Sequence, residues 1–156
     1  MHWWAVLTGV AWGVGYLALV YLLAPLESVG LVAVPLVLGA GPLAGAAAGW
    51  LARGGPAEST RHGLLAGSLT GLAFAGAFWH VLSVSRFDSL TPFGNGGAFY
   101  AAKLTFAYSA SDFPVVAAHP GRIAGALAVG GAVILALLGG YAGYVADARE
   151  EARFID

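Results

Sequence analysis

Four long runs of apolar residues divide the chain, and polar stretches of different lengths separate them. The runs cover residues 3–24, 29–52, 63–84 and 123–145, and none contains Asp, Glu, Lys or Arg away from its ends. A helix needs about 20 mainly apolar residues to cross a hydrocarbon core ~30 Å thick. The pattern therefore predicts an all-α fold, an integral membrane four-helix bundle formed by a single domain over residues 1–156.

The polar stretches set the predicted connections between the helices. We expect a short turn after the first run, a polar turn at 53–61, a long outer loop at 85–121 and a cytoplasmic tail at 146–156. The aromatic residues of the outer loop favour packing of that loop over the outer face of the bundle. Pro35 and Pro42 remove backbone hydrogen bonds from the second run, so we expect a kink there.

Glycine recurs at every fourth position in the second and third runs. Four residues is close to one helical turn, so each row lies on one face of its helix, where another backbone can approach closely. In lipid, close packing of small residues is a main source of helix association. We predict helix-packing roles for these rows and for glycines of the first and fourth helices: Gly9, Gly13, Gly41, Gly45, Gly49, Gly63, Gly67, Gly71 and Gly125. On the fourth helix we expect Ala132, Ala136 and Gly140 to extend the small face.

The segment from Leu38 to Gly71 resembles the core of a family of small haloarchaeal four-helix membrane proteins, known only as a domain of unknown function. The resemblance rests on a Gly-Pro-Leu-x-Gly-x-x-x-Gly helix from Gly41, a short polar turn with glycines, and a Gly-x-x-x-Gly helix from Gly63. The turn carries less charge than is usual in that family, and the long aromatic loop has no counterpart in the pattern. The resemblance implies a four-span membrane protein and brings no catalytic residue with it.

Composition supports a bilayer as the main surroundings of the chain. Hydrophobic residues make up 59% and charged residues 10% of the 156 residues, whereas a soluble domain has about 25% charged residues. The net charge of −1 gives no indication of a nucleic-acid partner. Because the chain has no cysteine, disulfides, thiolate nucleophiles and cysteine-ligated metals are excluded.

The distribution of arginine and lysine predicts the orientation in the membrane. No Lys or Arg precedes the first run, and the run is longer than the core of a signal peptide, so we expect a retained first helix. The short turn at 53–61 and the tail carry four arginines between them, against three basic residues, Arg86, Lys103 and Arg122, in the long loop and directly after it. Basic residues in short loops favour the cytoplasmic side. We therefore predict a multi-pass protein of the cell membrane with both termini in the cytoplasm.

Two histidines and two aspartates flank the outer loop and are the candidates for metal chemistry. His80 and His119, with Asp88 and Asp112, offer donors for a divalent metal, and the two imidazoles alone would suit a haem iron. Interfacial histidines and solvated loop acids account for these residues without a ligand, and no His-x-x-x-His or Glu-x-x-His spacing occurs among them. We therefore expect no cofactor and keep these residues only as candidates.

The apolar runs also limit the function. Without acidic or basic residues inside the runs, most proton-coupled pump and ion-pair transport mechanisms are excluded. Ser68 has no base positioned by the sequence, so we predict no enzyme. Small faces on all four helices favour a self-associating bundle or a subunit of a larger membrane assembly. The alternatives are a channel or transporter for a small neutral solute, supported by the proline-broken second helix, and a haem- or metal-binding membrane protein.

Overall fold

The computed structural model describes residues 2–23, 30–83 and 112–153, with side chains at 2–20, 34–79 and 112–148. Within these ranges every regular element is an α-helix, which confirms the prediction of an all-α fold for the described residues. The helices are α1 (Trp3–Leu23), α2 (Gly30–Leu38), α3 (Ala40–Ala52), α4 (Pro56–Ser83), α6 (Pro114–Ala118) and α7 (Pro120–Arg153).

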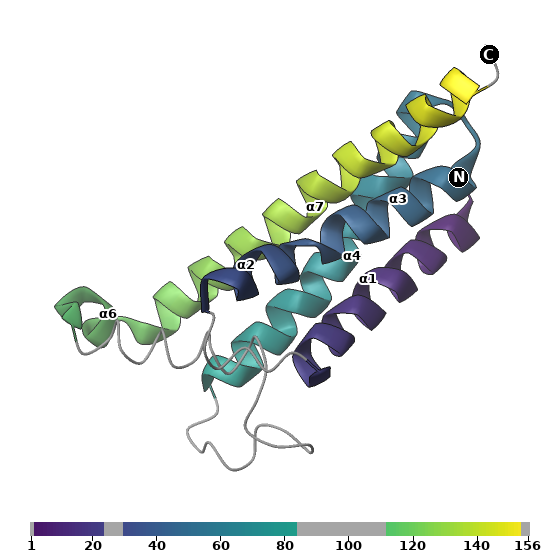
Figure 1. Cartoon of the computed structure of the whole chain (residues 1–156). Coiled ribbons are helices and arrows are strands. Elements are labelled where there is room, and N and C mark those ends of the chain that lie inside the picture. The colour runs from purple at the N-terminus through teal and green to yellow at the C-terminus, as the bar shows by residue number, and fades with distance from the viewer. Residues whose placement is uncertain (1, 24–29, 84–111, 154–156) are drawn as a thin grey trace.

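The helices form an elongated bundle centred on the pair α3 and α4 (Figure 1). These two helices run antiparallel, because only residues 53–55 separate them. α7 packs along both α3 and α4, and α1 packs against the same two helices. The N- and C-terminal ends of the chain lie at the same end of the bundle as the turn between α3 and α4 (Figure 1).

The interior of the bundle is made largely of small residues. Near the termini, Val6 packs with the fully buried alanines of α3 and α4, Ala44, Ala48 and Ala66. Further along the bundle the core gains larger side chains: Leu17, Phe74 and Leu135, packed around Ala40. The outer surface exposes many large apolar side chains from every long helix. An exterior with so many large apolar side chains is typical of a surface that faces lipid or a partner.

Three stretches of the described residues are long and apolar enough to cross a membrane: Trp3–Val20, Val34–Ala52 and Pro120–Ala148. They support a membrane protein by length and composition. The predicted third span at 63–84 falls largely on α4, whose side chains the structure describes only as far as residue 79, and it is not among these three. α4 has 28 residues, about 42 Å at 1.5 Å per residue, which exceeds a hydrocarbon core ~30 Å thick.

The second apolar run is interrupted at Gly39 rather than forming one helix over 29–52. The ring of Pro42 clashes with the carbonyl group four residues earlier, that of Leu38, and supplies no N–H to bond with it. Gly39 still donates its N–H to the carbonyl oxygen of Pro35 at 3.0 Å. The kink therefore falls between the two prolines, as their positions predict, and separates α2 from α3.

The polar turn between α3 and α4 is shorter than the predicted 53–61. Arg53 ends α3 in the left-handed conformation, with φ of 47°, and Gly55 follows with φ of 82°. α4 then begins at Pro56, because a proline fits the first helical position, where no N–H partner is needed. The carbonyl oxygen of Gly55 accepts hydrogen bonds from the backbone N–H groups of Glu58 and Ser59. The prediction that 56–61 is a turn is wrong.

The last helix is longer than the predicted 123–145. α7 runs from Pro120 to Arg153 and so includes most of the stretch expected to be a tail. Of the predicted outer loop, residues 85–111 lie outside the described residues, so its packing stays a prediction. The remainder of that loop forms the short helix α6 and the first residues of α7.

Candidate functional site

The first glycine row lies against the backbone of α7. A Cβ atom at Gly41 would lie 2.6 Å from the carbonyl oxygen of Leu135, and one at Gly49 would lie 2.6 Å from the Cα atom of Gly143. Between them, a Cβ atom at Gly45 would overlap the backbone of Gly139. Real Cβ contacts are not this short, so only glycine fits at these points of α3.

The second glycine row, on α4, meets the same face of α7. A Cβ atom at Gly63 would lie 2.5 Å from the carbonyl oxygen of Gly139, and one at Gly67 would lie 2.7 Å from that of Leu135. At Gly71 the nearest atom is the carbonyl oxygen of Ala132, at 2.6 Å. α7 therefore lies in a groove whose two walls are the glycine rows of α3 and α4. We call this contact the glycine seam.

The glycines of α1 face the other side of α3 and α4. A Cβ atom at Gly9 would lie 2.5 Å from the carbonyl oxygen of Ala44, and one at Gly13 would lie 2.5 Å from the hydroxyl oxygen of Thr70. That hydroxyl is buried and has no hydrogen-bond partner among the described residues. α1 thus also packs through its small residues.

On α7 the sequence analysis missed the two residues of closest approach. Gly139 and Gly143 each contact both α3 and α4, and they are spaced by one helical turn. The predicted Gly125 instead faces the Trp79 ring, where a Cβ atom would lie at an ordinary 3.4 Å. Gly140, adjacent to the true position, faces Leu64. The Gly139-x-x-x-Gly143 spacing was the signal available in the sequence.

A small group of polar side chains is buried where the two termini lie. His62 is 1% exposed, and its Nδ1 lies 2.8 Å from the carbonyl oxygen of Glu58. Because a carbonyl only accepts, Nδ1 carries the hydrogen, and Nε2 accepts the backbone N–H of His2 at 2.9 Å. His62 on α4 therefore holds the residue before α1 through a hydrogen bond.

Beside this histidine, Ser59 joins all three helices of the seam. Its hydroxyl oxygen on α4 lies 3.2 Å from the carbonyl oxygen of Gly49 on α3. It also lies 3.2 Å from Oδ1 of Asp147 on α7. Ser59 is 0% and Asp147 7% exposed. Both ring nitrogens of His62 are occupied elsewhere, so the three residues do not form the hydrogen-bonded chain of a catalytic triad.

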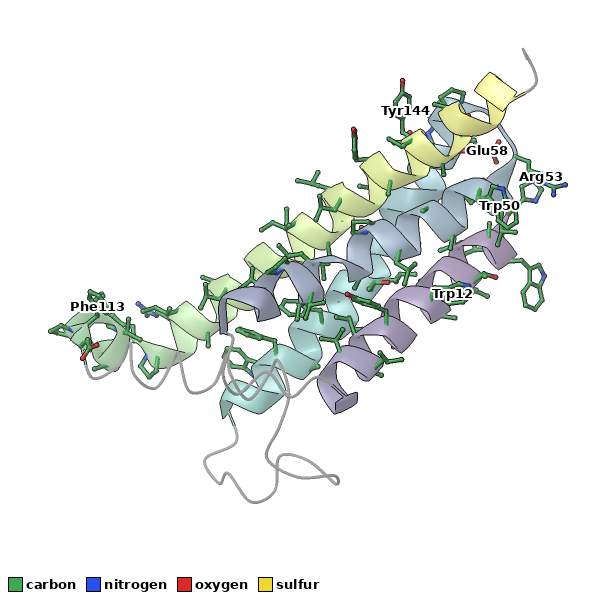
Figure 2. All side chains as sticks on the ribbon, viewed as in Figure 1. Trp12, Trp50, Arg53, Glu58, Phe113 and Tyr144 are labelled. Atoms are coloured by element: carbon green, nitrogen blue, oxygen red, sulfur yellow. The ribbon has the colours of Figure 1, made fainter. Side chains whose placement is uncertain are left out.

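An apolar groove of about 550 Å³ runs along the outer side of α1. Every lining residue but one belongs to that helix: Trp4, Leu7, Thr8, Ala11, Trp12, Gly15, Tyr16, Leu19 and, from α3, Leu43. Gly15 has open space on its side-chain position. Figure 2 shows Trp12 on the outside of α1. We call this feature the α1 groove.

The candidate metal ligands are not brought together in the described part of the structure. Asp112 and His119 are exposed at the two ends of the segment that contains α6. His80 lies in α4, but its side chain is outside the described set, and Asp88 lies outside the described residues. Among the residues that the structure describes, no three His, Cys, Asp or Glu side chains lie close enough to hold a metal.

Comparison with known proteins gives no relative for this fold. No family model, curated protein or solved structure matches the chain. The resemblance to small haloarchaeal membrane proteins therefore stays a prediction, and the site has to be interpreted from its own geometry.

Proposed function

We propose that the protein is a non-enzymatic, multi-pass membrane protein: a four-span bundle closed by the glycine seam that associates with further copies of itself in the bilayer. The observation that supports this most is the seam. Backbone contact at the six glycines of the two rows, without intervening side chains, would forgo apolar burial in water, whereas in lipid it is a favourable mode of association. The spans are α1, α2 with α3, α4, and α7.

The place of α4 in the bundle supports its role as a span. Three of its polar residues are turned inward: Thr70 faces α1, and Ser59 and His62 are buried. Beyond Arg61, which is exposed near the start of the helix, the residues that α4 exposes as far as 79 are apolar, among them Leu64, Leu69 and Leu72. A helix that keeps its polar groups inside the bundle meets lipid with an apolar face.

The ends of the bundle also suit two membrane interfaces. Trp50 and Tyr144 lie at the same end of the bundle as Arg53, and Phe113 lies at the other end (Figure 2). Tryptophan and tyrosine favour the headgroup level, and arginine favours the cytoplasmic side. This arrangement supports both termini in the cytoplasm.

Self-association is proposed through the α1 groove of two copies. The small faces that predicted self-association are occupied within one bundle, where α7 and α1 pack against α3 and α4. The α1 groove is what remains, and its lining includes the small residues Thr8, Ala11 and Gly15. A two-fold axis would bring α1 against α1 with the same surface on both copies. Because α7 fills the seam, we do not propose transport along it.

Single cysteines test the four-span topology, because the chain has no native cysteine. Ala57→Cys, Ala118→Cys and Ala148→Cys would each be treated with a membrane-impermeant thiol reagent in intact cells. We expect labelling at 118 from outside, and at 57 and 148 only after permeabilisation. Labelling of 57 and 118 from the same side would show that α4 does not cross and would contradict the proposal.

A bulky residue in the α1 groove tests the association. Gly15→Ile should shift the protein towards monomers in subunit counting by photobleaching in liposomes, while its unfolding midpoint stays near that of the unaltered protein. Gly76→Ile is the matched control, because Gly76 is also open but lies on α4. A monomer for the unaltered chain at every protein-to-lipid ratio would contradict self-association.

A further inference from the structure

The buried cluster of Ser59, Asp147 and the Gly49 carbonyl has more acceptors than hydrogens. The Ser59 hydroxyl has one hydrogen, yet it lies 3.2 Å from two oxygens, Gly49 O and Asp147 Oδ1. It can donate to only one of them at a time. The second carboxylate oxygen, Asp147 Oδ2, is buried and has no hydrogen-bond partner among the described residues.

A buried carboxylate without enough donors is costly unless it takes up a proton or a cation accompanies it. Asp147 is 93% buried, since 7% of its surface is exposed. Asp147 Oδ2 has no hydrogen-bond partner among the residues whose side chains the structure describes. A cation bound at these oxygens would compensate the buried negative charge.

We propose that Asp147, Ser59 and the carbonyl oxygen of Gly49 form a binding site for one Na⁺-sized monovalent cation, which ties α7 to α3 and α4. All ligands are oxygens, which suit hard cations rather than transition metals. One carboxylate carries a single negative charge, so a monovalent ion neutralises the site whereas a divalent ion leaves a buried excess charge.

The spacing of the oxygens suits an ion of this size. Oxygens at about 2.4 Å from a shared cation, the distance typical of Ca²⁺, are about 3.4 Å apart in an octahedral arrangement. The two separations of 3.2 Å at Ser59 are close to that value. Na⁺ has nearly the radius of Ca²⁺, and the larger K⁺ would need a wider site.

The glycine seam builds this site. Gly143 lies one helical turn before Asp147, and a Cβ atom there would lie 2.5 Å from the carbonyl oxygen of Ser59. This close approach is what brings the carboxylate to the hydroxyl. Gly49 lies in the last turn of α3, whose final carbonyls have no partner within the helix and form its negative end. The cation would lie where that end and the carboxylate meet.

Thermal unfolding in detergent at constant ionic strength tests the site, with NaCl replacing choline chloride. A saturable rise of the melting temperature is expected, roughly 5–10 °C between no Na⁺ and a hundred times its Kd, with a smaller rise in KCl. Asp147→Asn should abolish this dependence, and the exposed control Asp112→Asn should keep it. Equal melting temperatures in NaCl and choline chloride, or an unchanged dependence in Asp147→Asn, would overturn the proposal.

A second measurement covers the case in which Asp147→Asn fails to fold. The ²³Na NMR line of the unaltered protein should broaden on binding and narrow when Li⁺ is added in excess, while choline at the same concentration has no effect. A line no broader than that of a detergent blank would overturn the site. Neither result depends on topology or self-association, so the proposed function is tested separately.

Discussion

At the scale of single residues, the same amino acid has two different roles in this bundle. Gly45 lies against the backbone of Gly139, where no side chain fits, whereas Gly15 has open space at the position of a Cβ atom. Both are interior to helices of the bundle. Substituting alanine at each position therefore separates the effect of close packing from the effect that glycine has on any helix.

Gly45→Ala is expected to destabilise the protein by about 2 kcal/mol, since the added methyl group meets rigid backbone and forces α3 and α7 apart. Gly15→Ala should leave stability unchanged or raise it by up to ~1 kcal/mol, because alanine favours a helix. Unfolding in mixed micelles against SDS measures both. Equal effects of the two variants would contradict the seam.

A second residue-scale prediction concerns the buried histidine. His62→Ala removes the acceptor for the His2 N–H and the donor to Glu58, which should cost about 1–3 kcal/mol. Amide hydrogen exchange in the first turn of α1 should become faster, since that turn loses its contact with α4. His119→Ala is the control, because His119 is exposed. Unchanged exchange at α1 in His62→Ala would contradict the anchoring role.

At the scale of elements, α7 has one buried face and one exposed face, and both carry leucines, so hydropathy alone does not tell them apart. Leu135 is fully buried at the seam, while Leu137, two residues on, is 62% exposed. The predicted small face of this helix included Ala132 and Ala136, which meet the glycine row of α4, and Gly125 and Gly140, which face Trp79 and Leu64 instead. Ala136-x-x-x-Gly140 and Gly139-x-x-x-Gly143 both have a four-residue spacing, and only the neighbouring helices decide between them.

The two leucines give the element-scale prediction. Leu135→Ala should cost about 2–5 kcal/mol, because it leaves a cavity between α7 and the two glycine rows. Leu137→Ala should cost less than ~1 kcal/mol, since its side chain faces outward in both states. The same SDS titration compares them. A larger loss of stability for Leu137→Ala than for Leu135→Ala would mean that the buried face of α7 is assigned wrongly.

Helix boundaries were harder to predict than helix existence. The long apolar runs predicted each helix that the structure describes except α6, and the prolines predicted the interruption near Gly39. The polar residues Glu58, Ser59 and Thr60 suggested a turn, yet Pro56 starts a helix there and tertiary contacts bury Ser59. Local polarity is a poor guide where a polar group has a partner from a distant part of the chain.

At the scale of the whole molecule, the glycine spacing of the second and third runs carried the most information about the fold. It indicated faces for close approach, but it did not say which helix would occupy them. The polar cluster at the termini was not predictable, because Ser59 and Asp147 are 88 positions apart and no local pattern links them. The folded arrangement of α3, α4 and α7 creates that site.

The central claim is that α7 lies along α4 in the register of the seam, within the membrane. Leu64 and Gly140 test it most directly, because a Cβ atom at Gly140 would lie 3.5 Å from that of Leu64, within the range for a disulfide. The Leu64→Cys, Gly140→Cys pair should form an intramolecular disulfide rapidly under mild oxidation in native membranes. A pair with Tyr141→Cys in place of Gly140→Cys should not. No disulfide in the first pair, or equal rates in the two, would contradict the account.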